Sequence, residues 1–368
     1  METVKLGLLI KKTKVARCGN FSYPVLSITK QDGIIMQSEK FKKRIASADT
    51  SDYKIIPRGK LVQGIHIDEG NFGIQDIVDN GIVSPAYGVW DVNDELVVPK
   101  YLEMVLRSPK SIEFYRSKLT GTVSRRGHMS DTDFLSMDVP FPDKDTQSKI
   151  LETMKQTTSV LCSRQQQLAK LDELVKARFV EMFGTYPDNP FGWNTGKIQD
   201  VVSDVRYGSS RPAVEGGKYP YLRMNNITYA GELDLTDTKR IDVPDNELDK
   251  CTVRRGDVLF NRTNSKELVG KTCVYNRDDM MVLAGFVIRV RVNERILPEF
   301  LVAFLNTDFS KQMLLGMCKT AIGQANINAK EMQNIGLYIP PIALQEQFVD
   351  LKNQIDKSKV EVQKALDQ

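Results

Sequence analysis

The sequence is poor in the residues that most catalytic and metal sites require. It has two histidines, His66 and His128, and neither has a companion at the spacing of a metal site or a catalytic triad. Its five cysteines are odd in number and scattered, without a Cys-x-x-Cys pair, which favours reduced thiols over a disulfide framework or a zinc site. We therefore expect no catalytic residue and no metal in this chain, and a cytoplasmic location. His66, between two isoleucines, is expected in a strand.

Long apolar runs and complete cofactor loops are also missing. The run Met281-Val282-Leu283-Ala284 is far shorter than the roughly 18 residues that cross a bilayer, and the first residues lack the pattern of a signal peptide. Gly270-Lys271-Thr272 resembles the end of a phosphate-binding loop, but Ser265 stands where the first glycine belongs. Asn189-Pro190-Phe191-Gly192 lacks the second proline of a methyltransferase motif. We expect no cofactor to bind to this chain.

The composition is that of a globular protein of two domains. The chain has 368 residues, of which 41% are hydrophobic and 27% charged, enough to bury two cores. The net charge of +4 is too small to indicate a nucleic-acid partner by itself.

What the sequence does contain is an internal repeat with a period of about 198 residues. Val139-Pro140-Phe141-Pro142 followed by Gln147 returns as Tyr338-Ile339-Pro340-Pro341 followed by Gln345. Upstream, the match continues at offsets shifted by one or two residues, as in Arg58-Gly59 and Arg255-Gly256, Pro99 and Pro298, and Tyr23-Pro24 and Tyr219-Pro220. Small shifts of this kind arise from insertions in surface loops. The period is that of a domain, so we expect two related domains with approximate two-fold symmetry.

Each repeat begins with short β-rich runs and continues with helices, which predicts an α+β fold. A helix is expected to begin at Pro99 and again at Pro298, because proline is tolerated in a first helical turn. The predicted divisions are a first domain at residues 1–146, a central helix at 147–183, a second domain at 184–344 and a distal helix at 345–368.

The two helices are expected to pack on each other as an antiparallel, coiled-coil-like pair. Residues 147–183 contain no proline or glycine, and apolar residues recur there every seven positions. This central helix would be roughly 55 Å long. The distal helix is shorter, which leaves open whether its length is natural or the result of truncation. The residues predicted to form the docking surface for partners are Leu161, Leu168, Val175, Phe348, Ile355 and Val362.

Three polar strings in the second repeat are candidates for DNA contacts. Arginine can form two hydrogen bonds with guanine, and asparagine or glutamine can do so with adenine. The candidate residues are Arg223, Asn225, Asn226, Asn261, Arg262, Asn264, Gln324 and Asn326 in the second repeat, and Ser27, Lys30, Arg125 and Arg126 in the first. The same residue types also form ordinary turns. The candidates differ between the repeats whereas the prolines and glycines recur, as expected for two readers of different sequences on one scaffold.

Several strings together resemble the specificity subunit of type I restriction-modification systems. They are Tyr219-Pro220-Tyr221-Leu222-Arg223-Met224-Asn225-Asn226, Arg255-Gly256-Asp257-Val258-Leu259, Pro340-Pro341-Ile342-Ala343-Leu344-Gln345 and Ala177-Arg178-Phe179. The resemblance implies two α/β target-recognition domains joined by two helices, each domain reading one half of a bipartite site in double-stranded DNA. It also implies two methyltransferase (modification) subunits as partners, and further restriction subunits. S-adenosylmethionine, ATP and Mg²⁺ would then belong to those partners.

Two other functions remain open from the sequence. The first is a two-domain helical scaffold that holds proteins and does not read DNA. The second is a nuclease or methyltransferase of unfamiliar sequence.

Overall fold

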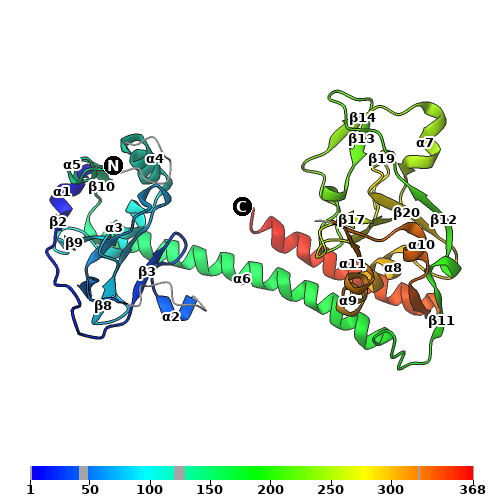
Figure 1. Ribbon diagram of the computed structural model, residues 1–368, viewed down its shortest axis with the longest axis horizontal. Coiled ribbons are helices and arrows are strands. Elements are labelled where there is room, and N and C mark those ends of the chain that lie inside the picture. Colours follow the sequence, from blue (N-terminus) through cyan, green and yellow to red (C-terminus); the bar gives the residue numbers. More distant parts are fainter. Residues whose placement is uncertain (1, 41–48, 120–128, 322–323, 368) are drawn as a thin grey trace. The chain divides into compact units, whose positions relative to one another are not determined.

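The structure, a computed structural model, describes residues 2–40, 49–119, 129–321 and 324–367, without the side chains of residues 319–321 and 324. The chain divides into two compact units, Met1–Val160 and Leu161–Gln368. The division falls within helix α6 (Lys144–Phe183), which is continuous between the two units (Figure 1).

Each unit is built on a four-stranded antiparallel sheet, and the strands have the same order in both. In the first unit the order is β2 (Ile10–Lys12), β9 (Gly88–Val92), β6 (Leu61–Gln63) and β7 (Phe72–Ile74). In the second it is β12 (Val202–Tyr207), β20 (Val287–Val292), β16 (Val258–Asn261) and β18 (Thr272–Val274). The strand registers place Leu61 and Val258 at the same position. The repeat in the sequence is therefore a repeat of topology.

A second set of strands lies beside each main sheet. The first unit has the pairs β3 (Leu26–Thr29) with β4 (Gly33–Met36) and β5 (Lys54–Pro57) with β8 (Asn80–Val83). The second unit has the order β14 (Lys239–Ile241), β13 (Tyr219–Leu222), β19 (Met281–Leu283) and β15 (Thr252–Val253). A parallel bridge joins Val25 to Ile82, and the parallel pair Tyr221–Val282 takes the same place in the second unit.

The remaining elements also occur largely in matching pairs. The first unit contains β1 (Thr3–Lys5), α1 (Leu6–Leu9), α2 (Gln37–Lys40), η1 (Ile67–Glu69), α3 (Pro99–Leu106), α4 (Pro109–Lys118), α5 (Asp131–Leu135) and β10 (Asp138–Pro140). The second contains β11 (Asn194–Lys197), η2 (Ile198–Val201), η3 (Met224–Asn226), α7 (Asp245–Cys251), β17 (Thr263–Asn264), α8 (Pro298–Leu305), α9 (Asp308–Met317), β21 (Lys319–Ala321), β22 (Gln324–Asn326), α10 (Ala329–Gln333), β23 (Gly336–Ile339) and α11 (Ile342–Lys364).

The repeated Arg-Gly string forms the same turn in both units. Gly59 and Gly256 have φ values of 90° and 88°, in the left-handed region that favours glycine. The amide of Gly59 donates to the carbonyl of Gln75 at 2.7 Å, and the amide of Gly256 donates to that of Tyr275 at 2.9 Å. The sequence repeats this glycine because the turn before β6 and β16 requires its backbone conformation.

A buried glutamine fixes the start of the long helix in each unit. The Oε1 atom of Gln147 accepts from the amide of Val98 at 2.8 Å, while its Nε2 atom donates to the carbonyl of Pro142 at 2.8 Å. Gln345 makes the equivalent bonds to Leu297 and Pro340, also at 2.8 Å. Both glutamines are 0% exposed. Each therefore joins the first turn of the long helix to the first turn of α3 or α8.

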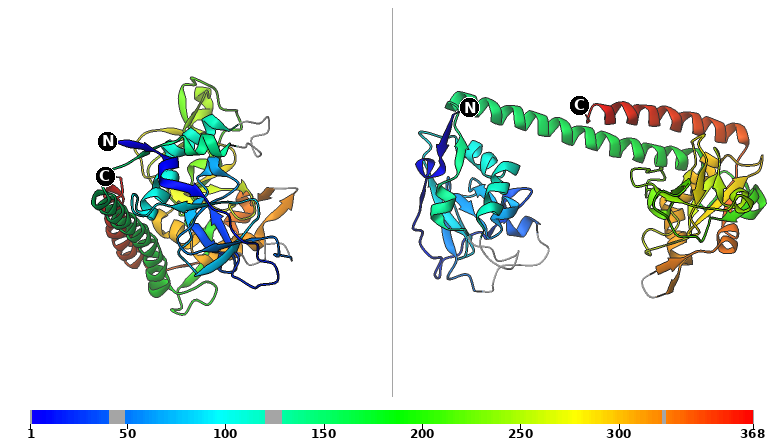
Figure 2. Two further views of the ribbon diagram at one scale, coloured as in Figure 1. Left: turned by 90° about the vertical axis from the view of Figure 1, so that its left-hand side faces the viewer. Right: turned by 90° about the horizontal axis from the view of Figure 1, so that it is seen from above.

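In the second unit, α11 packs antiparallel on the last part of α6, and its ribbon runs beside that of α6 (Figure 2). Phe348 near the start of α11 lies 5.3 Å from Phe179 and 5.7 Å from Phe183, measured between ring centroids. Further along α11, Lys359 forms an ion pair with Asp172 at 2.7 Å. The two helices therefore run in opposite directions.

The expected fold class, with two related α/β domains and an antiparallel helix pair, is confirmed. The helices begin three residues earlier than expected, at Lys144 and Ile342, because helical geometry extends into the turns around the prolines. The expectation that His66 lies in a strand is wrong. His66 follows the end of β6 and precedes the short helix η1, whose amide at Glu69 donates to the His66 carbonyl.

Replacing Gln345 with alanine should destabilise the second unit. The substitution removes the buried hydrogen bonds that the Gln345 side chain makes with the amide of Leu297 and the carbonyl of Pro340. Leaving such groups unpaired should lower the free energy of unfolding by about 1–3 kcal/mol. Urea unfolding monitored by circular dichroism measures the shift. The control is Gln347→Ala on the same helix, where the side chain is exposed. Equal unfolding midpoints for the two variants would contradict the role given to Gln345.

Candidate nucleic-acid interface

Two of the three predicted polar strings meet in one small sheet of the second unit. β17 pairs with β22, with Thr263 opposite Asn326 and Asn264 opposite Ala325, and β22 pairs in turn with β21. The sheet therefore places Arg262 and Asn264 beside Asn326, although 62 positions separate Asn264 from Asn326 in the sequence. Gln324 belongs to the same sheet by its backbone, and its side chain lies outside the described residues.

Arg262 is held by contacts at both its backbone and its guanidinium. Its amide donates to the carbonyl of Phe286 at 3.0 Å, and its carbonyl accepts from the amide of Ile327 at 2.9 Å. The guanidinium lies 4.9 Å from the ring centroid of Tyr207, and its Nη2 atom donates to Oδ1 of Asn326 at 3.4 Å. This side chain is only partly buried.

Two of the predicted contact residues have buried side chains. Asn261 is 0% exposed and Asn226 is 2% exposed. Oδ1 of Asn226 accepts from the amide of Arg223 at 2.9 Å, and its Nδ2 donates to the carbonyl of Asp234 at 2.8 Å. Oδ1 of Asn261 accepts from the amide of Thr263 at 3.3 Å. These amides shape the loops, and neither is placed to contact a ligand at the surface.

The other candidate side chains of the second unit differ in the intramolecular bonds that they form. Nη2 of Arg223 forms an ion pair with Asp237 at 2.8 Å, so its charge is balanced within the chain. Oδ1 of Asn264 accepts from the amide of Ser265 at 2.9 Å. Asn225 is exposed. The string at Arg223 lies outside the β17–β22 sheet.

In the first unit, the structure describes two of the four candidates. Ser27 lies in β3, where its hydroxyl accepts from Nε2 of Gln37 at 3.1 Å. Lys30 is exposed, and its carbonyl accepts from Arg107 at 2.8 Å. Arg125 and Arg126 lie outside the described residues. Ser27 stands two residues past the bridge at Val25, as Arg223 stands two past the pair at Tyr221.

Equivalent positions after the third strand of each main sheet carry different chemistry. The amide of Gly64 donates to the carbonyl of Asn71 at 2.8 Å, and the amide of Asn261 donates to that of Lys271 at 2.8 Å. The next residue in each case is therefore also equivalent. It is Ile65 in the first unit, with 57% of its side chain exposed, and Arg262 in the second.

Lys271 is buried and bonded to the backbone, although the sequence around it resembles a phosphate-binding loop. Its Nζ atom donates to the carbonyl of Met224 at 3.0 Å, and the side chain is 7% exposed. Burial lowers the pKa of Lys271 from its usual value. Thr272 begins β18 directly afterwards, so no helix follows to bind a phosphate.

Sequence reasoning missed two aromatic–cation contacts near these residues. One is Tyr207 with Arg262. The other is Tyr229, whose ring centroid lies 4.9 Å from Nζ of Lys311. Burial, and then the charges of Lys176 and Lys271, lowers the pKa of Lys311 to about 8. The partners in each contact are more than 50 residues apart in the sequence, so local patterns could not join them. An aromatic residue ending a strand, as Tyr207 does, was the available signal.

The predicted docking residues are divided between the surface and the interior. Leu161 is 41% exposed, and Leu168 and Val175 are partly buried. The three on α11 face the chain's own interior, with exposures of 0% for Phe348, 7% for Ile355 and 7% for Val362. The α11 residues are thus buried within the chain, and the docking of partners on these helices stays a prediction.

Beside the helix pair lies a groove of about 800 Å³ with charged walls. Lys359 lies in this groove. It forms ion pairs with Asp172 of α6 at 2.7 Å and with Glu232, in the loop between η3 and β14, at 2.8 Å. Burial lowers the pKa of Lys359, but the two carboxylates raise it more, so the net shift is upward. Within the described ranges, no group of three or more His, Cys, Asp or Glu side chains is placed to hold a metal ion. None of the described helices is long and apolar enough to cross a bilayer.

Comparison with known proteins agrees with this architecture. Residues 190–368 match the family model of the type I restriction modification DNA specificity domain. Residues 190–368 thus form a domain of the type I restriction-modification specificity family. The matched residues of this specificity domain include the β17–β22 sheet, Arg262 and helix α11.

Three relatives illustrate the likeness. The specificity subunit of the type I restriction enzyme EcoKI from Escherichia coli is 25% identical over 185 residues, which are 49% of this chain and 40% of that protein. The putative MjaX specificity subunit from Methanocaldococcus jannaschii is 25% identical over 171 residues, 45% of this chain and 40% of that protein. The alignments thus span less than half the length of these relatives.

The third relative is a solved structure reported as "Structural basis underlying complex assembly and conformational transition of the type I R-M system". One of its chains aligns with a TM-score of 0.58 and 19% identity, covering 99% of this chain and 95% of that one. At this identity the likeness supports the fold alone.

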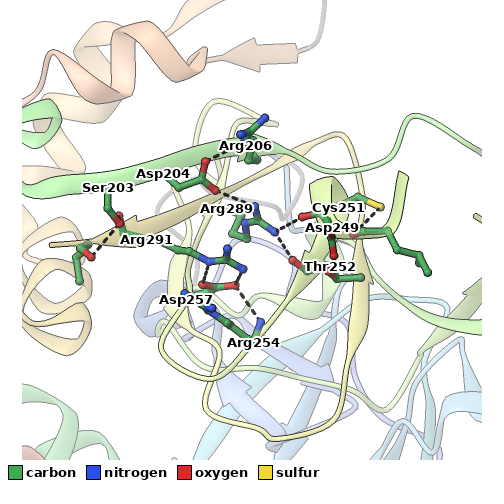
Figure 3. A network of polar contacts seen from close by, with 12 residues as sticks. Ser203, Asp204, Arg206, Asp249, Cys251, Thr252, Arg254, Asp257, Arg289 and Arg291 are labelled. Carbon is green, nitrogen blue, oxygen red and sulfur yellow. Dashed lines mark hydrogen bonds and ion pairs between the residues drawn. The ribbon is translucent and has the colours of Figure 1, made fainter. Parts of the chain in front are cut away.

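Two ion pairs, each with one buried partner, hold the specificity domain's main sheet together (Figure 3). Arg289 of β20 is 2% exposed and forms an ion pair with Asp204 of β12 at 2.8 Å. Arg289 also donates to the carbonyls of Thr252 and Asp249. On the same strand, Arg291 forms an ion pair with Asp257 at 2.8 Å. These bonds fix the strands that carry Tyr207 and Arg262.

The pair Arg291–Asp257 has a counterpart of reversed charge in the first unit. There Lys60 precedes β6 as Asp257 precedes β16, and Lys60 forms an ion pair with Asp91 of β9. The cation and the anion have exchanged strands. Both units thus have an ion pair at this position, although the residues that form it differ.

Replacing Asp204 with asparagine should make the free energy of unfolding less dependent on pH in the acid range. Burial raises the pKa of Asp204, but hydrogen bonds from Arg206 and Arg289 lower it more, so it lies below its ordinary value of 3.8. A depressed pKa gives stability that is present above about pH 4 and lost as the pH falls through the folded-state pKa. At pH 7 we expect D204N to be less stable than wild type by about 1.5–3 kcal/mol.

Urea unfolding at a series of pH values measures this difference. The gap between wild type and D204N should shrink as the pH falls below about 4. The control is Asp278→Asn, which removes the same charge from a pair with Arg255 that is 84% exposed at the carboxylate and should have a smaller effect. A gap that stays constant at all pH values would contradict the role given to Asp204.

Proposed function

We propose that this chain is the DNA-specificity subunit of a type I restriction-modification complex and has no catalytic activity of its own. Each unit reads one half of a bipartite site in double-stranded DNA. The observation that carries this proposal is the contrast between a repeated framework and non-repeated polar residues. Gly59 and Gly256, and Gln147 and Gln345, make the same bonds, whereas Ile65 and Arg262 differ in chemistry at one equivalent position.

The proposed mechanism is geometric. The two domains predicted at residues 1–146 and 184–344 contact successive major grooves, and the helices set the separation between the two half-sites. Two methyltransferase subunits dock on the helices, and restriction subunits join them. S-adenosylmethionine is bound by the methyltransferase subunits, and ATP and Mg²⁺ serve the restriction subunits. The methyltransferase flips the target adenine out of the duplex.

A scaffold that does not read DNA is the alternative, and a direct experiment separates the two. The chain is co-expressed with its modification subunit, and methylation is mapped by long-read sequencing. A split motif that appears only when both chains are present supports the proposal. If the assembled complex forms but neither methylates a defined site nor binds duplex DNA in a salt-dependent manner, the scaffold is the correct function.

A deletion in the exposed part of α6 tests the role of the helix as a spacer. Residues 152–160 are exposed, so removing residues 155–158 shortens the helix by about 6 Å without disturbing a core. That length corresponds to about two base pairs. We expect the two half-site sequences to persist while the spacer between them changes.

The control for the deletion is the double substitution Thr157→Ala and Thr158→Ala, which changes the same surface but keeps the length. It should leave the motif unchanged. A deletion variant that methylates with the original spacer would show that α6 does not determine the separation of the half-sites.

A further inference from the structure

Three side chains from separate parts of the second unit meet at the end of its main sheet. Arg262 directly follows β16, Tyr207 ends β12, and Asn326 ends β22. The guanidinium lies 4.9 Å from the Tyr207 ring centroid and 3.4 Å from Oδ1 of Asn326. We propose that Arg262 reads a guanine in the half-site contacted by the second unit, with Tyr207 and Asn326 as positioning residues. This inference rests on the proposed function and adds the base and the side chains that specify it.

Arg262 differs from the other candidate side chains in its charge and exposure. Asn226 and Asn261 are buried, and Arg223 is paired with Asp237. Among residues 2–40, 49–119, 129–321 and 324–367, no carboxylate forms an ion pair with Arg262. Within those residues, the positive charge of Arg262 has no opposite charge beside it, and the guanidinium contacts the ring of Tyr207 and the neutral amide of Asn326.

The geometry suits the recognition of a guanine edge. Guanine presents two acceptors, O6 and N7, in the major groove, and the planar fork of an arginine can donate to both. A guanidinium packed on an aromatic ring keeps its plane and loses less freedom when it binds. The bond to Asn326 is at the long end of the hydrogen-bond range, so a base acceptor can displace it at little cost.

Tyr207 is itself fixed in place by its hydroxyl. Its Oη atom accepts from the amide of Ala329, at the start of α10, at 2.9 Å. The residue is nevertheless 43% exposed, which is unusual for an aromatic residue whose only role is packing. The tyrosine thus connects β12 and α10 while presenting its ring to Arg262.

The first unit lacks this constellation at the equivalent position. Ile65 follows β6 as Arg262 follows β16, and it has no hydrogen-bond donor in its side chain. A guanine contact from this position is therefore confined to the half-site of the second unit.

Methylation mapping of the complete complex with its modification subunit tests the proposal. The variants are Arg262→Gln and Arg262→Lys, the second of which keeps the charge and the aliphatic stem. Both should relax the preference for guanine at one position of one half-site by roughly five- to a hundredfold, the range for loss of a bidentate contact. The other half-site should be unchanged. The control is Arg255→Gln, whose guanidinium is exposed and paired with Asp278, and it should leave both half-sites unchanged.

Two further variants test the positioning role of Tyr207. Tyr207→Phe keeps the ring and should keep the guanine preference, although it loses the bond to Ala329. Tyr207→Leu removes the ring and should relax the same position as Arg262→Gln. A structural role alone would lower thermal stability in both without changing the base preference.

Three outcomes would overturn the inference and leave the proposed function intact. One is an unchanged motif with uniformly weaker methylation in Arg262→Lys and Arg262→Gln, which would indicate a phosphate contact. Another is relaxation at a position that is not a G·C pair in the wild type. The third is that Tyr207→Leu keeps the full preference. By contrast, a wild-type complex without any split motif would contradict the proposed function itself.

Discussion

Much of the architecture depends on one buried polar contact that occurs twice. The side-chain amides of Gln147 and Gln345 are fully buried, and each satisfies a backbone amide at the start of one helix and a backbone carbonyl at the start of another. A buried amide without partners is costly, so this position strongly favours glutamine and a single geometry. In each unit the long helix therefore leaves its globular part in a fixed direction. The proposed function, in which the helices set the separation of the half-sites, requires such a rigid junction.

Around this junction, the two units preserve geometry while changing chemistry. The glycine turns at Gly59 and Gly256 are the same to within 2° in φ, because the backbone conformation there allows little else. The ion pairs Lys60–Asp91 and Arg291–Asp257 keep the attraction with the charges exchanged. Arg262 and Ile65 share a backbone position and no chemistry. This order, from backbone to ion pair to the side chain that follows the third strand, is what the proposed function requires of a common scaffold with variable reading residues.

The sequence predicted the framework well for a physical reason. Prolines at helix starts, glycines in left-handed turns and a breaker-free helical stretch are constraints on the local backbone, and each leaves a local trace. The candidate site was predicted less completely. Asn226 and Asn261 look like surface contact residues in the sequence, but both are buried and shape loops. Asparagine performs either role in a turn, and only tertiary burial decides which. The contact between Tyr207 and Arg262 depends on the pairing of three strands, which no local pattern encodes. Their role in reading DNA, like that of the other candidate residues, stays a prediction.

The framework is common to both units, and we propose that sequence reading belongs to each unit separately. We would replace the globular part of the first unit, residues 1–142, with a second copy of residues 191–340, which end at the equivalent proline, and keep α6 and α11. The motif methylated by the resulting complex is then determined by long-read sequencing. We expect a site in which the half recognised by the second unit occurs twice. A motif that retains the original half-site of the first unit would contradict it, because reading would then not reside in the exchanged unit.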